Sequence, residues 1–309
     1  MKVRIQNQGK LVSMAALLLL TCTADYAQFV ISVVVPNNRA SIDGTSGSGL
    51  PFANRASVRS QQVYDASQFS AINEDGGWIK WISFRIDGEC RHSFGTDVAS
   101  LQINLSTTSK VPDGLSSIFA ENVGTDDIIV FGPGSVSLVE GCSPGTSPEP
   151  FGMLIRFTTP FYYNPNNGNL LMDIRNYSGG TDPGMNPGLI DGELTTGDSV
   201  SRAVATDVNA TSALARDSFG LVTRFEIWPN PKLNVELQTN SVVLSWAANP
   251  ESFVLQTTPF LLPEPTWKPA SNDFAYSTNG LTKIYSIPLD SAGASGFFRL
   301  VSPMAAAPP

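Results

Sequence analysis

Residues 151–177 read FGMLIRFTTPFYYNPNNGNLLMDIRNY, and the inference of a fold starts from this segment. Two apolar stretches, residues 151–157 and 170–175, have the length and content of β-strands. The intervening residues 158–169 are rich in Asn, Pro and Gly, which favour turns. We therefore expect a β-hairpin, or two adjacent strands, below a long aromatic loop that carries no catalytic signature.

The composition as a whole favours an all-β protein. Charged residues make up only 15% of the 309 residues, while Gly (26) and Pro (22) are abundant. Long helices would bring periodic blocks of Glu, Lys, Ala and Leu, and no such block occurs after residue 30. Many short strands joined by turns are therefore expected, in a chain long enough for two domains.

Alternation of apolar and polar residues identifies individual strands. Ile82, Phe84 and Ile86 alternate with Ser83 and Arg85, a period that buries one face of a strand and leaves the other wet. Similar reasoning predicts further strands at residues 29–35, 59–65, 101–105, 128–131, 135–139 and 218–227.

One short helix and two long loops complete the prediction for this part of the chain. Leu115, Ile118 and Phe119 would share one face of a helix that Gly124 could end. Residues 41–51 are rich in Gly and Ser, and residues 181–198 are long and poor in strand signals. Both segments are expected to be loops.

The chain is expected to divide at Trp228-Pro229-Asn230-Pro231, because two prolines in three residues cannot continue a central strand. Residues 28–228 then form a larger jelly-roll-like antiparallel sandwich. Residues 229–302 form a small immunoglobulin-like sandwich, with strands at residues 235–237, 242–246, 253–256, 283–287 and 296–300. Residues 303–309 are low in complexity and are expected to be disordered.

The first 27 residues have the features of a secretory signal. Lys2, Arg4 and Lys10 precede an apolar run at residues 11–20, and small residues precede a cleavage site expected within residues 24–28. The run is shorter than the roughly 20 residues that span a bilayer. We expect export to the medium or the cell surface, with no transmembrane segment after signal removal.

The charge balance argues against one class of partner. The net charge is −8, and removal of the predicted signal leaves 16 basic and 26 acidic side chains, a net charge of −10. Phosphate binding needs a basic surface, so nucleic acid is excluded as a partner.

Two cysteines, Cys90 and Cys142, would remain in the exported chain, while Cys22 would be lost with the signal. In an oxidising compartment two thiols are most simply one disulfide. Such a bond would stabilise the fold by about 4 kcal/mol in the chain-entropy model.

Two resemblances support the picture of an exported protein. Leu244-Ser245-Trp246, residues 253–258, Trp267 and Gly296-Phe297-Phe298-Arg299-Leu300 resemble small immunoglobulin- or fibronectin-like modules that end many exported bacterial proteins. This resemblance implies a spacer, attachment or sorting role. Residues 61–65, 82–85 and 160–174 resemble uncharacterised exported bacterial β-sandwich surface proteins, which imply no catalytic residues. The absence of a C-terminal membrane anchor departs from that group.

Catalytic constellations are poorly represented. The single histidine, His92, would have to serve any Ser-His-Asp triad, and no Gly-x-Ser-x-Gly elbow occurs. One histidine and two cysteines also cannot supply the usual zinc ligands. A glycoside hydrolase would need two carboxylates across a cleft, and the sequence alone selects no pair among the many acids.

Aromatic residues offer a non-catalytic alternative. Phe161, Tyr162 and Tyr163 could present rings to a sugar or a partner protein, and Trp78 and Trp81 lie near several acids in a composition typical of sugar-binding clefts. The competing interpretation is that these rings pack down and close the end of the sandwich.

Calcium is the one cofactor that the sequence suggests. Asp182, Asn186, Asp191, Glu193 and Asp198 gather oxygen ligands in one segment, although their spacing matches no EF-hand. The competing interpretation is an ordinary solvated loop.

The leading hypothesis is a non-catalytic secreted or cell-surface protein that binds glycans or mediates adhesion, with a polysaccharide or cell-surface component as its partner. A carbohydrate-active hydrolase that uses a carboxylate pair, and a purely structural envelope or matrix component, remain the alternatives.

Overall fold

The computed structural model describes residues 3–5, 30–54, 56–72, 75–88, 92–142, 145–181, 188–247, 253–261, 265–270, 275–279, 282–288 and 296–301. Only β-strands and short 3-10 helices occur in these ranges, so the expected all-β class is confirmed. The chain forms two compact units, one of residues 30–230 and one of residues 231–309 together with residues 1–29.

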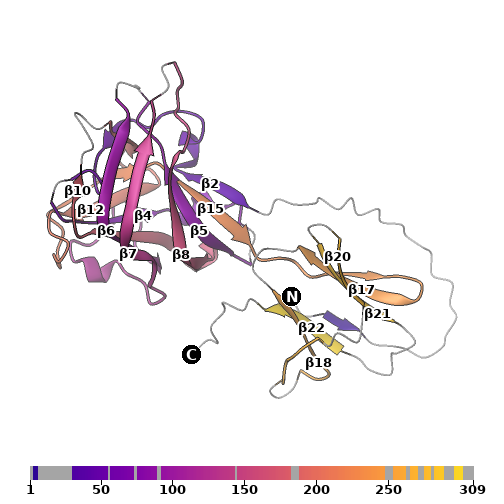
Figure 1. The fold of residues 1–309 in the computed structure, drawn as a ribbon. Coiled ribbons are helices and arrows are strands. Elements are labelled where there is room, and N and C mark those ends of the chain that lie inside the picture. The colour runs from indigo at the N-terminus through magenta and orange to yellow at the C-terminus, as the bar shows by residue number, and fades with distance from the viewer. Residues whose placement is uncertain are drawn as a thin grey trace. The chain divides into compact units, whose positions relative to one another are not determined.

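One layer of the larger unit is a four-stranded antiparallel sheet in the order β2-β15-β5-β8 (Figure 1). Its strands are β2 (Ile31–Val35), β15 (Thr223–Pro229), β5 (Gly77–Phe84) and β8 (Met153–Tyr163). The segment predicted as a linker therefore begins too early, because Trp228 pairs with Trp78 and Pro229 with Gly77. Pro229 is tolerated because the pairing of β15 with β2 ends at Ile227, so Pro229 has a partner strand on one side only.

The other layer is a seven-stranded sheet in the order β10-β6-β9-β4-β12-β13, with β7 also paired to β6. Its strands are β10 (Gly180–Thr181), β6 (Phe94–Thr108), β9 (Asn169–Asn176), β4 (Val58–Tyr64), β12 (Val200–Ala205), β13 (Ala215–Asp217) and β7 (Ile128–Glu140). Single 3-10 turns, η1 (Asn37–Arg39) and η2 (Ala66–Phe69), follow β2 and β4.

The hydrophobic core of this unit lies between the two layers. Val35, Ile82 and Phe225 from the four-stranded sheet and Ile103 and Ile174 from the seven-stranded sheet belong to one buried cluster. A sandwich-like fold follows from this arrangement, and the jelly-roll topology stays a prediction.

The predicted hairpin at residues 151–177 is wrong. Its two strands belong to opposite layers, because β8 pairs with β5 while β9 pairs with β4 and β6. Each stretch has the composition of a strand, but the sequence does not specify which neighbour completes its hydrogen bonds. The chain instead crosses from one sheet to the other.

The crossing is made by a short ordered turn. Asn164 accepts a hydrogen bond from the backbone N–H of Asn166 and so begins η4 (Pro165–Asn167). Gly168 has a φ of 141°, and a Cβ there would lie 2.8 Å from the carbonyl oxygen of Thr108. The Tyr163 hydroxyl donates to the carbonyl of Gly168 at 2.9 Å, which joins the end of β8 to the start of β9.

The predicted helix at residues 115–124 is also wrong, since only a single 3-10 turn, η3 (Phe119–Glu121), forms there. Ile118 has extended backbone and forms a β-bridge to Ser212. The Asn122 side chain accepts from the N–H of Ser116, and the Ser116 hydroxyl accepts from the N–H of Ile118. Such side chain to backbone bonds compete with a helix.

Both predicted long loops contain strand. A small sheet in the order β14-β11-β3 joins β14 (Phe219–Leu221), β11 (Ile190–Leu194) and β3 (Ser46–Ser48). Gly192 lies in β11, where a Cβ would come within 2.3 Å of the Phe219 ring. Gly192 is therefore needed for close packing against the Phe219 ring. In the sequence, the same glycine was one of the signals for a loop.

The smaller unit contains two four-stranded sheets, in the orders β16-β17-β21-β20 and β1-β22-β18-β19. The first holds β16 (Asn234–Leu237), β17 (Ser241–Ala247), β21 (Thr282–Pro288) and β20 (Ala275–Asn279). The second holds β1 (Val3–Ile5), β22 (Gly296–Val301), β18 (Val254–Thr258) and β19 (Lys268–Pro269). Its core surrounds Trp246, Leu255 and Phe298. The immunoglobulin-like detail stays a prediction.

Strand β1 lies within the predicted signal, and the remaining residues of that segment lie outside the described ranges, so export stays a prediction. Within those ranges, no helix has the length and apolar content needed to cross a membrane. The expected tail at residues 303–309 also lies outside them.

Candidate binding face

The outer face of the four-stranded sheet carries a row of aromatic rings. Successive residues of a strand point to opposite sides of its sheet, so Phe225 and Ile227 enter the core while Glu226 and Trp228 point outward. Trp228 lies opposite Trp78, and Trp78 lies opposite Tyr162. Three neighbouring strands thus place three rings side by side.

Trp81 extends this surface by one further row. It lies between Glu226 of β15 and Arg156 of β8. Its ring meets that of Trp228 edge to face, with centroids 6.1 Å apart. Trp78 and Tyr162 are 5.3 Å apart and tilted by 60°. We call Trp78, Trp81, Tyr162 and Trp228 the aromatic face.

Hydrogen bonds hold two of these rings in place. The indole Nε1 of Trp78 donates to Oδ1 of Asn230 at 3.2 Å, and the Tyr162 hydroxyl donates to the carbonyl oxygen of Asp75 at 2.6 Å. Asn230 in turn donates to the same carbonyl at 2.8 Å. Burial raises the pKa of Tyr162 above its usual value, with a smaller contribution from the Asp75 carboxylate. The hydroxyl therefore stays protonated and able to donate at neutral pH.

The rings differ in how much surface they offer. Tyr162 is 37% exposed, Trp81 and Trp228 are half-buried, and Trp78 is nearly covered at 9%. The Nε1 atom of Trp228 is buried and has no hydrogen-bond partner. Trp78 thus supports the face from beneath, while the other three rings can contact a partner.

Cationic side chains lie over or beside these rings. The Lys80 ammonium is 3.6 Å from the centroid of the Trp228 ring, and the Arg156 guanidinium is 5.4 Å from that of Trp81. Both distances fall within the range of cation–π attraction. Arg224 forms a 2.9 Å ion pair with Glu226, whose other oxygen accepts from Ser32 at 2.5 Å.

The predicted aromatic tip is divided by the pleat of β8. Phe161 and Tyr163 point into the core, with 2% and 0% of their surfaces exposed, and only Tyr162 points outward. Burial raises the pKa of Tyr163 well above its usual value. Three consecutive rings on a strand cannot share one face, so Phe161 and Tyr163 are not available to a partner.

The structure does bring together Trp78, Trp81 and Tyr162, which the sequence suggested separately. Trp228 was missed, because the prolines on either side of Asn230 placed it in a linker. The alternation of Phe225, Ile227 and their outward neighbours was the signal that could have identified it.

The proposed calcium ligands do not form a cation site among the described residues. Asp182 and Asn186 lie outside the described ranges. Asp191, which is fully buried, pairs with Arg85 at 2.7 Å and accepts from the N–H of Gly44. Glu193 pairs with Arg39 at 2.5 Å. Within the described part of the chain, no group of three His, Cys, Asp or Glu side chains could hold a metal ion.

Asp198 differs from these two acids because no arginine among the described residues pairs with it. One of its oxygens accepts from the N–H of Val200 at 2.8 Å, and the other is buried without a partner. Burial, followed by the charges of Glu193 and Asp113, raises its pKa to about 6. The calcium hypothesis therefore gains nothing from the described geometry.

His92 and the cysteines show no catalytic arrangement among the described residues. His92 is exposed in a bend, and Cys142 is half-buried beside the core. Cys90 lies outside the described ranges, so its disulfide with Cys142 stays a prediction.

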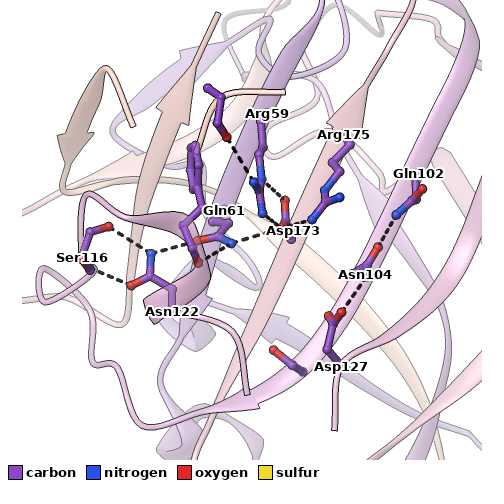
Figure 2. A network of polar contacts seen from close by, with 12 residues as sticks. Arg59, Gln61, Gln102, Asn104, Ser116, Asn122, Asp127, Asp173 and Arg175 are labelled. Atoms are coloured by element: carbon purple, nitrogen blue, oxygen red, sulfur yellow. Dashed lines mark hydrogen bonds and ion pairs between the residues drawn. The ribbon is translucent and has the colours of Figure 1, made fainter. Parts of the chain in front are cut away.

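The outer face of the seven-stranded sheet carries a different kind of cluster, which the sequence did not reveal (Figure 2). Asp173 of β9 accepts two hydrogen bonds from Arg59, at 3.2 and 2.6 Å, and one from Gln61 at 3.1 Å. Arg175 approaches the same carboxylate at 3.4 Å. Asp173 is only 2% exposed and so satisfies several neighbouring donors at once.

This cluster holds a covering segment in place. Asn122 donates to Gln61 at 2.9 Å and to the carbonyl of Ser116 at 3.0 Å, as Figure 2 shows. Phe119 packs into a small apolar cluster with Leu171 of β9. These groups bond mainly to each other, so we assign the cluster of Arg59, Gln61, Asn122 and Asp173 a structural role and name it the polar cluster.

Comparison with known proteins does not add a family to this geometry. Family models, curated proteins and solved structures gave no match to the chain. The two resemblances described above therefore stay predictions.

Proposed function

We propose that the chain is a non-catalytic, exported protein whose larger unit binds polysaccharide through the aromatic face. One observation carries the proposal, the row of Trp81, Trp228 and Tyr162 rings on the outer surface of a sheet. The predicted signal segment supports a secreted or cell-surface location. The resemblance of the smaller unit to immunoglobulin-like modules supports a spacer or attachment role for it.

The geometry suits sugars for a physical reason. A pyranose ring has a flat side of C–H groups and a rim of hydroxyls, so it stacks on an aromatic ring while its hydroxyls bond to neighbouring polar groups. Strands hold the rings of the aromatic face, and hydrogen bonds further fix Trp78 and Tyr162. Little side-chain entropy is then lost when a ligand binds.

A binding test with matched variants would examine this proposal. The purified protein would be run in native gels that contain individual polysaccharides, and its retardation would be measured. Trp81→Ala and Tyr162→Ala should each lower the apparent affinity, calculated from the retardation, at least about tenfold. This corresponds to a change of about 1.4 kcal/mol in binding free energy. Tyr177→Ala is the matched control, since Tyr177 is 39% exposed but lies beyond β9 of the other sheet.

The same samples separate the alternatives. Retardation without release of reducing ends supports a binding protein, whereas reducing ends released in proportion to protein would support a hydrolase instead. If no polysaccharide retards the protein, or if Tyr177→Ala weakens binding as much as Tyr162→Ala, the aromatic face is not the binding site.

A further inference from the structure

Arg156 differs from the other described arginines of the larger unit because its guanidinium forms no hydrogen bond or ion pair with any described residue. It is exposed on β8, and its one contact among the described residues is the cation–π contact with Trp81. Its guanidinium therefore presents N–H donors to solvent above an aromatic ring.

The remaining described arginines of this unit are all engaged. Six of them pair with carboxylates, namely Arg39, Arg59, Arg85, Arg175, Arg202 and Arg224. The seventh, Arg216, donates to the carbonyl oxygen of Leu115 at 2.8 Å.

Two further charged side chains lie near Arg156 on this sheet. Glu226, the carboxylate in the same cross-strand row, already bonds to Arg224 and Ser32. Lys80 adds a second cation over Trp228. Negative charge lies at the other end of the aromatic face, where the Asp75 carboxylate contributes to the raised pKa of Tyr162.

We infer that the aromatic face selects anionic polysaccharides, with a sugar ring on Trp81 and its carboxylate or sulfate group on Arg156. This inference rests on the proposed function. A guanidinium matches two oxygens of such a group with two parallel N–H bonds, and its contact with the Trp81 ring helps to orient it. The net negative charge of the protein would repel polyanions elsewhere, so the local site decides the selectivity.

Matched pairs of polymers test the inference. Polygalacturonate would be compared with its fully methyl-esterified form, which keeps the backbone but removes the charge. Kappa-carrageenan would be compared with its chemically desulfated form, which keeps the backbone but removes the sulfate. The first pair tests the carboxylate and the second the sulfate, each by retardation in native gels.

Charge variants identify the residue responsible. Arg156→Gln should weaken binding of the anionic polymer about tenfold, and Arg156→Lys should recover only part of the loss because an ammonium cannot form the paired bonds. Lys110→Gln removes one positive charge next to β6 of the other sheet and should leave binding unchanged. Raising the salt concentration should weaken wild-type binding more than Arg156→Gln binding.

The outcomes separate this inference from the proposed function. Preference for an anionic polymer over its neutral partner, reduced in Arg156→Gln, supports both. Equal binding of charged and neutral polymers, with loss in Trp81→Ala, overturns the inference and keeps the proposed function. Absence of binding to every polymer overturns both.

Discussion

The two outer faces of the larger unit both carry side chains that hydrogen bonds hold in place, but the two faces differ in how much of those side chains stays exposed. On the seven-stranded sheet, the polar cluster bonds to itself and to the segment around η3, so its donors and acceptors are consumed within the fold. On the four-stranded sheet, hydrogen bonds fix Trp78 and Tyr162, while ring surface of Tyr162, Trp81 and Trp228 stays exposed. The difference shows that a side chain fixed by hydrogen bonds can bind a partner only if part of its surface is still exposed to solvent.

The largest expected effect is on the polar cluster. Asp173→Ala would remove the carboxylate that pairs with Arg59 and, at a longer distance, with Arg175. Removing one partner of a buried ion pair typically lowers the free energy of unfolding by about 3–5 kcal/mol. Equilibrium unfolding in denaturant would measure the loss, while polysaccharide binding by the folded fraction should not change. A loss of unfolding free energy below about 1 kcal/mol would mean that the polar cluster does not stabilise this face of the seven-stranded sheet.

A smaller loss of stability is expected at the covering segment. Asn122 is fully buried and bonds to Gln61 and to the backbone of Ser116. Asn122→Ala leaves those groups unpaired at a typical cost of about 1–3 kcal/mol. Proteolysis under native conditions should then cut first within the segment around η3. Protection equal to that of the wild type would contradict the assigned role.

The aromatic face should show the opposite pattern, a loss of binding with little loss of stability. Trp228→Ala removes a half-buried ring whose Nε1 makes no hydrogen bond to the described residues, so none of them loses a hydrogen-bond partner. We expect binding to fall about tenfold, equivalent to about 1.4 kcal/mol. Unfolding free energy should change less than in Asp173→Ala. If Trp228→Ala proves the more destabilising of the two, the comparison between the faces fails.

The smallest expected effect is a pH dependence of folding stability that arises from Asp127, on the outer face of the seven-stranded sheet. Burial, followed by the charge of Asp173, raises the pKa of Asp127, although Asn104 donates to it at 2.9 Å. The folded state then holds the Asp127 proton more tightly than the unfolded state, so ionisation of this group lowers stability as the pH rises from about 4. Because Asp127 is largely exposed, the effect should be only a few tenths of a kcal/mol.

Asp127→Asn checks this sign directly. The variant should lose that part of the pH dependence of unfolding and be slightly more stable than the wild type at neutral pH. A variant less stable at neutral pH than at pH 4, relative to the wild type, would show that the ionised carboxylate is favoured in the folded state.

Local patterns in the sequence predicted the strands well and their partners poorly. Alternation at residues 82–86 and 101–105 identifies the apolar side chains that enter the core, because period two depends only on neighbouring residues. The expected wet face is wrong, since other segments also bury the intervening polar residues, which are Ser83, Arg85, Gln102 and Asn104. The crossing between β8 and β9 depends instead on which distant strand each one meets. No short stretch of sequence contains that information.

The candidate site shows the same division. Trp78, Trp81 and Tyr162 were recognised by residue type, but their common face follows from the register of β5 against β8. The polar cluster was missed because Arg59, Gln61 and Asp173 look like solvent-facing residues until η3 covers them. Asp191 and Glu193 were interpreted as calcium ligands because the arginines that pair with them are more than 100 residues away along the chain.

The turn at Asn164–Gly168 has a consequence for how this protein could be re-engineered. It follows directly after Tyr163, one residue from the exposed ring of Tyr162, and it connects two layers that otherwise share mainly apolar contacts. New chain ends placed between Asn166 and Asn167 would remove one of the covalent connections between the layers, that of β8 to β9, while keeping both strands intact. Such a circular permutant would allow the adjoining ends of β8 and β9 to move apart, and any change in polysaccharide affinity would measure how far the Tyr162 ring depends on this connection.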